Sequence, residues 1–260
     1  MFCALDHWPA ILRVLRSSRV HARPRRHQRP ALRHLPLEQL EERVVPAAVT
    51  LTVRSLANSG AGSLRQAITK ADHAAAGKSY IINIVRPGTM TLKTALPDLK
   101  RDITINGLGA SNTTVRRDSR PATPSFRVFT VDAGKTVRIS GLTIAGGKAS
   151  SIGGGLDNSG TLTVSDCVFS GNSAFLGGGG FLNGGTATVI GSTFTSNSAG
   201  GSGGLGGAGG GLDNSRTLTV SDCVFSGFST GGFGGGISGL EGLIQSGNTF
   251  TGDSPDGFSH

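Results

Sequence analysis

The sequence has few of the residues on which disulfide-rich or metal-bound domains depend. It contains 3 cysteines, 1 tryptophan and 1 tyrosine among 260 residues. Three cysteines cannot form a disulfide framework, and no C-x-x-C or paired Cys/His spacing indicates a zinc or redox site. No run of about 18 apolar residues occurs, so the sequence encodes no membrane-spanning helix. The 10 prolines and the lack of a G-X-Y period exclude a collagen-like chain.

Glycine and charge are distributed unevenly along the chain. Of the 42 glycines, 35 lie in the last 120 residues. Residues 1–46 carry a net charge of +5, residues 47–148 of +10 and residues 149–260 of −6. The basic residues are not interleaved with aromatic residues, as a nucleic-acid-binding face would require. We therefore expect no specific nucleic-acid partner.

Residues 1–46 are better explained as a basic targeting or disordered N-terminal segment than as a folded domain. The run LPLEQLEERVVPA lies at 35–47. It resembles the LExLExR-x-x-P-A motif that directly precedes the mature domain in many planctomycete surface and exported proteins. The alternative is a short amphipathic helix with Leu37, Leu40 and Val44 on one face. The resemblance implies export, so we expect an extracellular, cell-surface or outer-membrane-associated protein.

An internal repeat dominates the second half of the chain. The run GGGLDNSGTLTVSDCVFSGNS at 153–173 returns almost unchanged at 209–229. Weaker copies lie at 178–198 and 234–254, and the clear repeats extend over 131–254, with a period of 25 residues and a six-residue insertion in the glycine-rich stretch 200–211. A period of this length with strand-like units is typical of a solenoid.

Each repeat fits one coil of an all-β solenoid, a parallel β-helix with coils of about 25 residues. Apolar and polar residues alternate in Thr161–Val164, so Leu162 and Val164 face inward. Stacked coils place equivalent residues in columns that are one strand spacing apart. We predict an inward phenylalanine column and an asparagine ladder at a turn, which consist of Phe169, Phe194, Phe225 and Phe250 and of Asn158, Asn183 and Asn214, respectively.

The stretch before the repeats supplies the beginning of the β-helix domain, 47–260. Ser63 and Gln66 form a capping box, which predicts a helix at 63–76 that covers the first coil. Strand-like runs follow at 80–85, 90–92, 103–105 and 113–115. The last residues, DSPDGFSH, offer no comparable cap. We expect the C-terminal end to carry a short irregular cap, to associate with another chain or to be truncated.

Two sets of residues resemble known β-helix families. The run TVRSLANSGAGSLRQAITKAD at 52–72 resembles the opening of bacterial pectin-lyase-like right-handed parallel β-helix proteins. The G-G-L run at 154–156 and the F-S-G-N run at 169–172 resemble repeats of chlamydial polymorphic outer membrane proteins. The third copy departs from this pattern, with Phe228 in place of the asparagine. The resemblance covers residues 50–254 and implies a right-handed parallel β-helix.

Catalytic candidates follow from the same resemblance. β-Helix lyases use acidic residues that hold calcium and an arginine or lysine as base, and hydrolases of this fold use clustered aspartates. The repeat aligns Asp132 with Asp157 in one column, where two carboxylates could hold calcium or share a proton. Arg138 is the candidate base, and Arg127 is near in sequence, but no acidic partner is fixed beside either arginine. The aspartates are more often turn caps, so the sequence defines no firm catalytic, calcium or other cofactor site.

Three functions remain open. The first is an exported or cell-surface scaffold or adhesion-type protein without a catalytic site, with polysaccharide or another surface component as partner. The second is a polysaccharide lyase or glycoside hydrolase that acts on acidic polysaccharide. The third is a fragmentary, non-catalytic paralogue of a longer surface protein, which could self-associate through its C-terminal end. We favour the first, because Leu182 interrupts the acidic column between Asp157 and Asp213.

Overall fold

The computed structural model describes most of the proposed β-helix domain. The described residues are 48–74, 77–200, 208–230, 234–239 and 241–251, together with the backbone of 258–259. The proposed N-terminal segment 1–46 lies outside them. The described part consists of strands and of one helix, α1 (Leu64–Asp72). No helix in this part is both long and apolar enough to cross a membrane.

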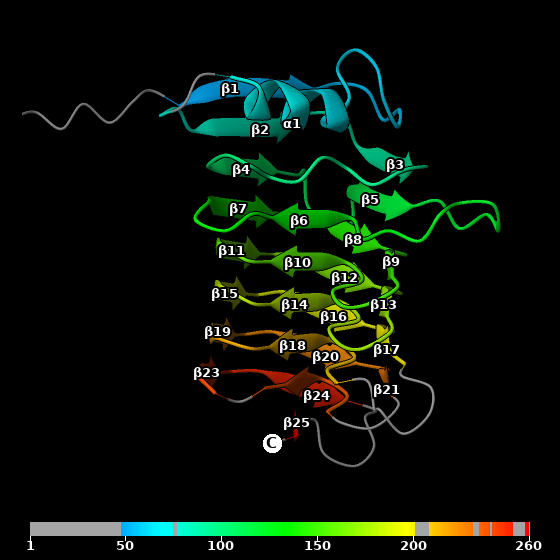
Figure 1. Ribbon diagram of the computed structural model, residues 1–260, viewed down its shortest axis with the longest axis vertical. Coiled ribbons are helices and arrows are strands. Elements are labelled where there is room, and N and C mark those ends of the chain that lie inside the picture. Colours follow the sequence, from blue (N-terminus) through cyan, green and yellow to red (C-terminus); the bar gives the residue numbers. More distant parts are fainter. Residues whose placement is uncertain are drawn as a thin grey trace, which may run out of the picture. The chain divides into compact units, whose positions relative to one another are not determined.

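The described strands form four parallel sheets, which confirms the predicted parallel β-helix (Figure 1). The long sheet contains β1 (Val49–Val53), β2 (Tyr80–Ile84), β4 (Ile103–Asn106), β7 (Thr136–Ser140), β11 (Thr161–Ser165), β15 (Thr186–Ile190), β19 (Thr217–Ser221) and β23 (Leu243–Ser246). The seven-stranded sheet contains β3 (Gly88–Leu92), β5 (Thr113–Arg117), β8 (Thr143–Ala145), β12 (Val168–Ser170), β16 (Thr193–Thr195), β20 (Val224–Ser226) and β24 (Thr249–Thr251).

Two smaller sheets complete the coils. The six-stranded sheet contains β6 (Phe129–Val131), β10 (Leu156–Asn158), β14 (Phe181–Asn183), β18 (Leu212–Asn214), β22 (Ile237–Ser238) and β25 (Phe258–Ser259). The four-stranded sheet contains β9 (Lys148–Ala149), β13 (Ser173–Ala174), β17 (Ser198–Ala199) and β21 (Ser229–Thr230).

One coil visits the four sheets in turn, and the next coil repeats the path. The strands β10, β11, β12 and β13 form one such coil, and β14, β15, β16 and β17 form the next. Thr161 pairs with Thr186, and Thr186 pairs with Thr217. These steps are the predicted 25 residues and 25 plus the six-residue insertion. The predicted strands after the capping helix are confirmed as β2, β3, β4 and β5.

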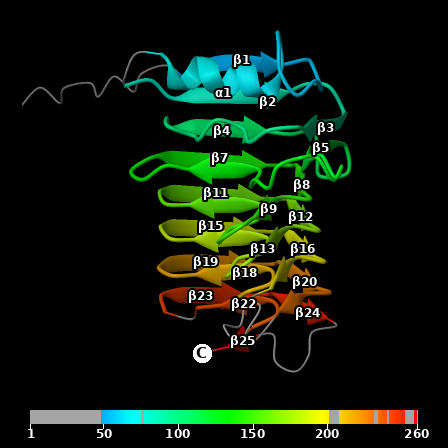
Figure 2. The same cartoon turned by 45° about the vertical axis from the view of Figure 1, so that its right-hand side comes forward.

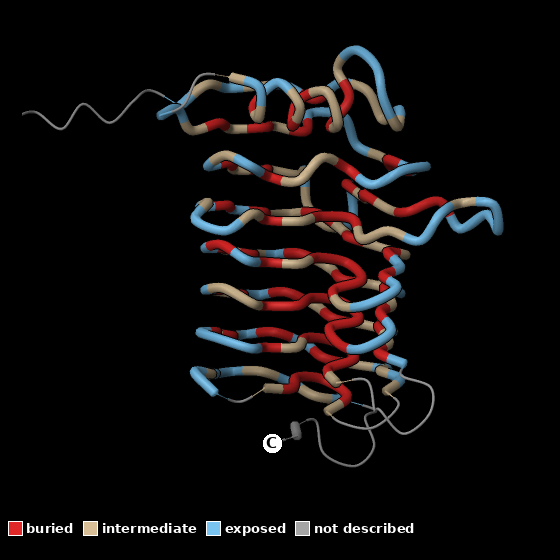
Figure 3. Tube along the Cα trace, in the orientation of Figure 1, coloured by how far each residue is buried: buried red, intermediate tan, exposed pale blue. Residues whose placement is uncertain are grey.

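The interior of the coils is filled by stacked apolar side chains. Figure 3 shows that buried residues recur in successive coils. The rings of Phe169 and Phe194 lie 4.7 Å apart, and those of Phe194 and Phe225 lie 4.9 Å apart. Phe250 continues the stack at 4.9 Å. Near-parallel stacking at this spacing follows from the strand separation, because the rings belong to equivalent residues of successive coils. The predicted phenylalanine column is confirmed.

The predicted asparagine ladder is confirmed at the turn between the six-stranded and the long sheet. The side chains of Asn158 and Asn183 are fully buried, and that of Asn214 is almost so. Each amide bonds to the next along the stack, at 2.8 Å in both steps. A second ladder, which was not predicted, joins Asn172 to Asn197 at 3.0 Å after the seven-stranded sheet. Both ladders satisfy buried turn groups that a β-helix leaves without strand partners.

The glycine triplets serve close packing between coils. A Cβ atom at Gly155 would lie 2.4 Å from the Gly180 carbonyl oxygen, and one at Gly180 would lie 2.5 Å from that of Gly211. Real Cβ atoms do not approach a backbone oxygen this closely, so each coil requires glycine here. The high glycine content of the second half therefore reflects the stacking of turns.

Helix α1 packs against β1 and β2 at the N-terminal end of the stack (Figure 2). The Ser63 hydroxyl accepts a bond from the Gln66 backbone N–H, as the capping box predicts. Gln66 Oε1 accepts from Gly62 N–H rather than from the N-cap residue. Leu64 and Ile68 are buried in the core, which confirms the capping role. The helix ends at Asp72, before the predicted residue 76, and the edge strand β1 was not predicted.

The last described strand, β25, pairs with β22 of the same chain. Residues 252–257, which connect β24 with β25, lie outside the described residues. Self-association through the C-terminal end remains a prediction.

Candidate functional site

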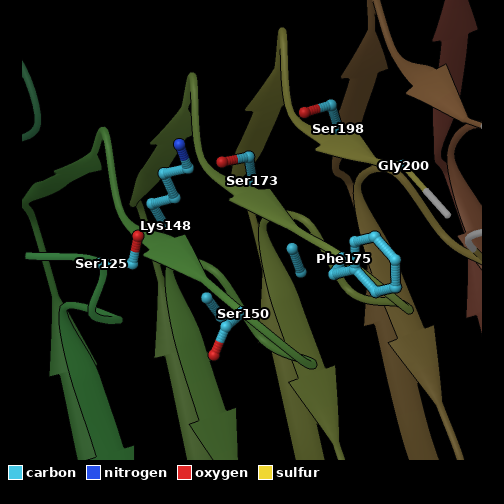
Figure 4. A pocket seen from close by; sticks show the side chains of 9 residues that line it. Ser125, Lys148, Ser150, Ser173, Phe175, Ser198 and Gly200 are labelled. Atoms are coloured by element: carbon cyan, nitrogen blue, oxygen red, sulfur yellow. The ribbon is translucent and has the colours of Figure 1, made fainter. Parts of the chain in front are cut away.

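A groove runs over the four-stranded sheet and has a volume of about 410 Å³ (Figure 4). Lys148, Ser173 and Ser198 occupy equivalent positions on β9, β13 and β17. Figure 4 shows these three side chains in a row on successive strands. The groove is lined by Ser125, Lys148, Ala149, Ser150, Ser173, Ala174, Phe175, Ser198 and Gly200.

Strand alternation produces this row. Each strand of the four-stranded sheet has only two residues, so one side chain points outward and the other inward. The inward positions are the alanines of β9, β13 and β17, which are at most 8% exposed. The outward positions present one ammonium group, from Lys148, and two hydroxyl groups, from Ser173 and Ser198. The row therefore offers hydrogen-bond donors and acceptors at one strand spacing, with a positive charge at one end.

One wall of the groove is lined by Ser150 and Phe175, which begin the turns 150–152 and 175–177 that leave the four-stranded sheet; we call these two turns the wall. The two turns are paired, because the Leu176 N–H donates to the Ser151 carbonyl oxygen at 2.7 Å. Phe175 projects from this wall and is 42% exposed. An exposed aromatic ring beside a hydroxyl row provides a flat apolar surface next to polar groups.

The segment 118–128 closes the end of the groove next to Lys148. It connects β5 to β6, and its Ser125 lines the groove beside Lys148 (Figure 4). The Phe126 carbonyl oxygen accepts a bond of 2.9 Å from the Lys148 N–H. Arg117 holds the segment from within, because its Nε donates to the Pro124 carbonyl oxygen at 2.7 Å and its guanidinium lies 5.6 Å from the Phe126 ring centre.

Arg127, in the same segment, forms an ion pair with Asp157 on β10. Its second nitrogen, Nη2, donates to the Ile152 carbonyl oxygen at 3.0 Å. Burial lowers the pKa of Arg127, and the negative charge of Asp98 opposes this shift. The expectation that Arg127 has no fixed acidic partner is therefore wrong. The partners are 30 residues apart in the sequence, and no repeat pattern relates them.

The predicted Asp132–Asp157 column is also wrong. Asp157 pairs with Thr130, and Val131 pairs with Asn158. The turn between β6 and β7 contains two more residues than the turn between β10 and β11, so the alignment of 25 residues fails locally. Asp132 lies in that longer turn, where its N–H donates to the Leu99 carbonyl oxygen at 3.3 Å. The structure therefore does not join these carboxylates into an acid/base or calcium pair.

Arg138 lies on a different face from the groove. It is an exposed residue of β7, between Thr104 and Thr163 on the outer surface of the long sheet. Its Nη1 lies 3.4 Å from the Thr163 hydroxyl oxygen. The three catalytic candidates thus lie in a turn (Asp132), on the six-stranded sheet (Asp157) and on the long sheet (Arg138).

Asp213 is the other carboxylate in the Asp157 column, and Leu182 separates the two as predicted. The Ser238 hydroxyl donates to its Oδ1 at 2.7 Å. Burial raises the pKa of Asp213, and this hydrogen bond opposes the shift. No group of three or more His, Cys, Asp or Glu side chains in the described part of the chain could hold a metal ion.

Sequence reasoning missed the groove. The 25-residue offset relates Lys148, Ser173 and Ser198, so the row could have been found from the repeat. Phe175 and Ser125 could not have been found in this way, because both lie in connections whose sequence does not repeat. In comparisons with known proteins, no family model, curated protein or solved structure shows significant similarity to this chain.

Proposed function

We propose that this chain is an exported or cell-surface scaffold of the adhesion type, whose groove over β9, β13 and β17 binds polysaccharide. The observation that carries the proposal is the row of Lys148, Ser173 and Ser198 beside the Phe175 ring. Serine hydroxyls can form hydrogen bonds with sugar hydroxyls, and an aromatic ring can stack on the apolar face of a pyranose. The ammonium group can form a charge-assisted hydrogen bond with a sugar carboxylate. Export rests on the resemblance of residues 35–47 to the LExLExR-x-x-P-A motif.

The row is suited to an extended ligand rather than to a compact one. Its three positions lie on adjacent strands, so the outer two are separated by about 10 Å, twice the strand spacing. The stacked core keeps this separation constant, because the buried side chains of Ile144, Phe169 and Phe194 occupy equivalent positions in the same three coils. A rigid row reduces the entropy that is lost when a chain-like ligand binds.

The test compares binding of polygalacturonate and of a neutral galactan by the whole chain and by matched variants. Lys148→Met should weaken polygalacturonate binding about tenfold, because a charge-assisted hydrogen bond is lost. Phe175→Ala should weaken binding of both polymers about fivefold through lost apolar contact. The control for Phe175 is Leu108→Ala, because Leu108 has a similar exposure, 43% against 42%, in the turn after β4. Absence of saturable binding to both polymers would contradict the proposal.

A further inference from the structure

The wall of the groove continues a backbone ladder from coil to coil. Ile152 is bridged to Gly177, and Gly177 is bridged to Ala208. The Gly153 N–H donates to the Gly177 carbonyl oxygen, and the Gly178 N–H donates to the Ala208 carbonyl oxygen, both at 3.0 Å. The carbonyl oxygens of Gly177 and Ala208, which are equivalent to that of Ile152, therefore each accept from an N–H of the preceding coil.

At the first rung the donor is a side chain. The segment that precedes Ile152 in the stack is 118–128, which replaces the regular turn of the later coils. The Ile152 carbonyl oxygen accepts from Arg127 Nη2 at 3.0 Å. The guanidinium thus supplies the hydrogen bond that a backbone N–H supplies in the coils below, and it caps the upper edge of the wall.

Asp157 holds that guanidinium in place. It accepts from Arg127 Nη1, while Nη2 remains directed at Ile152. The Arg127 side chain is 24% exposed and the Asp157 side chain 16%. Removal of one partner would leave the other as a largely buried charge without a counter-charge, which costs free energy. The pair is therefore stable in the folded state. The pair joins three parts of the fold: the segment 118–128, the wall and the six-stranded sheet.

From this geometry we infer that Arg127 and Asp157 are positioning residues for the groove. Asp157 holds Arg127 and does not have the catalytic role that the sequence suggested. Neither side chain lines the groove. Arg127 fixes the position of the wall, which carries Phe175. Because Arg127 belongs to the segment 118–128, it also fixes the position of Ser125. The inference rests on the proposed function where it concerns binding, but the hold on the wall can be measured without a ligand.

The first measurement is amide hydrogen exchange of the full chain. Arg127→Met removes both bonds of the guanidinium, and Arg138→Met is the matched control, because Arg138 is exposed on the long sheet. In Arg127→Met we expect the amides of Gly153 and Leu176 to exchange at least about tenfold faster, as for the loss of a charge-assisted hydrogen bond. In Arg138→Met the same amides should keep the wild-type rate.

The second measurement is polygalacturonate affinity. Arg127→Met and Asp157→Asn should each weaken it about fivefold or more, although neither residue touches the groove. Arg127→Lys keeps a charge beside Asp157 but loses the two-pronged geometry, so it should lie between wild type and Arg127→Met in both measurements. If Arg127→Met does not fold, Arg127→Lys and Asp157→Asn carry the same test.

The outcomes separate the inference from the proposed function. Unchanged exchange at Gly153 and Leu176 in the Arg127 variants overturns the inference, whether or not the protein binds polysaccharide. Faster exchange with unchanged affinity also overturns it, because the wall would then not govern binding. A wild-type chain that binds neither polymer contradicts the proposed function, while the exchange rates still decide whether Arg127 holds the wall.

Discussion

The side-chain amide of Asn158 donates a hydrogen bond of 2.8 Å to the amide oxygen of Asn183, one coil further along the stack. Asn183 repeats this contact with Asn214, again at 2.8 Å. Its Nδ2 also donates to the Thr217 carbonyl oxygen at 2.9 Å. A fully buried amide in the middle of a ladder thus satisfies groups in the coil before it and in the coil after it.

Asn183→Ala should lower the free energy of unfolding by about 3 kcal/mol, because buried polar groups on both sides lose their partner. Urea unfolding followed by circular dichroism measures this loss. Asn112→Ala is the control, since Asn112 is exposed and its side chain donates to a carbonyl oxygen of its own turn, that of Leu108. An equal loss in the two variants would show that the ladder adds nothing to stability.

Phe194→Ala should cost about 4 kcal/mol, because it opens a cavity in the middle of the ring stack. Phe194 is fully buried between Phe169 and Phe225. Phe194→Leu keeps most of the volume and should cost clearly less. The same unfolding experiment compares both with Phe175→Ala, for which a change within about 0.5 kcal/mol is expected at an exposed position. A small cost for Phe194→Ala would contradict the close packing of the column.

These two columns show what the sequence could predict. The repeat at 25 and 31 residues places each phenylalanine and asparagine directly above its equivalent, because strand pairing leaves no freedom of register along a stacked core. Alternation within Thr161–Val164 then settles which side chains face inward. The fold and its two main columns follow from these local rules.

Apart from the row of Lys148, Ser173 and Ser198, the candidate site depends on the parts of the coil that do not repeat. Two additional residues in the turn before β7 move Asp132 out of the Asp157 column. The segment 118–128 does not share the sequence of the turns that take its place in the later coils, so no periodicity could pair Arg127 with Asp157. A solenoid tolerates insertions at turns without loss of the core. Functional residues can therefore lie in turns whose sequence does not repeat.

The buried cysteine Cys167 should make stability depend on pH in the alkaline range. Burial raises the pKa of its thiol from 9.0 to about 11. The folded state therefore favours the protonated thiol, and this contribution is complete below the unfolded pKa and is lost as the pH rises from 9 toward 11. Urea unfolding of wild type and Cys167→Ala at several pH values measures it. We expect the stability of wild type to fall more steeply over this range, and parallel curves would contradict the expectation.

The ionised carboxylate of Asp213 should destabilise the folded state at neutral pH. Burial raises its pKa, so the folded state favours the protonated carboxyl, and this contribution is present below the unfolded pKa and lost as the pH rises through the folded pKa. Asp213→Asn should therefore be more stable than wild type at pH 7 and no more stable in acid.

Asp118 provides the opposite case for the same measurement. Hydrogen bonds from Arg120 lower the pKa of Asp118, so its contribution is present above the unfolded pKa and lost as the pH falls. Asp118→Asn should lower stability at pH 7, because the Asp118 side chain is buried although that of Arg120 is exposed, and should not lower it in acid. A gain for Asp213→Asn that persists unchanged in acid would show that charge burial is not its cause.

We propose that the groove binds polysaccharide and does not cleave it. The most direct measurement incubates the whole chain with polygalacturonate, with and without calcium, and determines bound polymer together with new reducing or unsaturated chain ends. We expect saturable binding that depends on Lys148 and Phe175, with no new ends. New ends that disappear in Asp157→Asn or Arg138→Met would contradict it and would make this protein an enzyme.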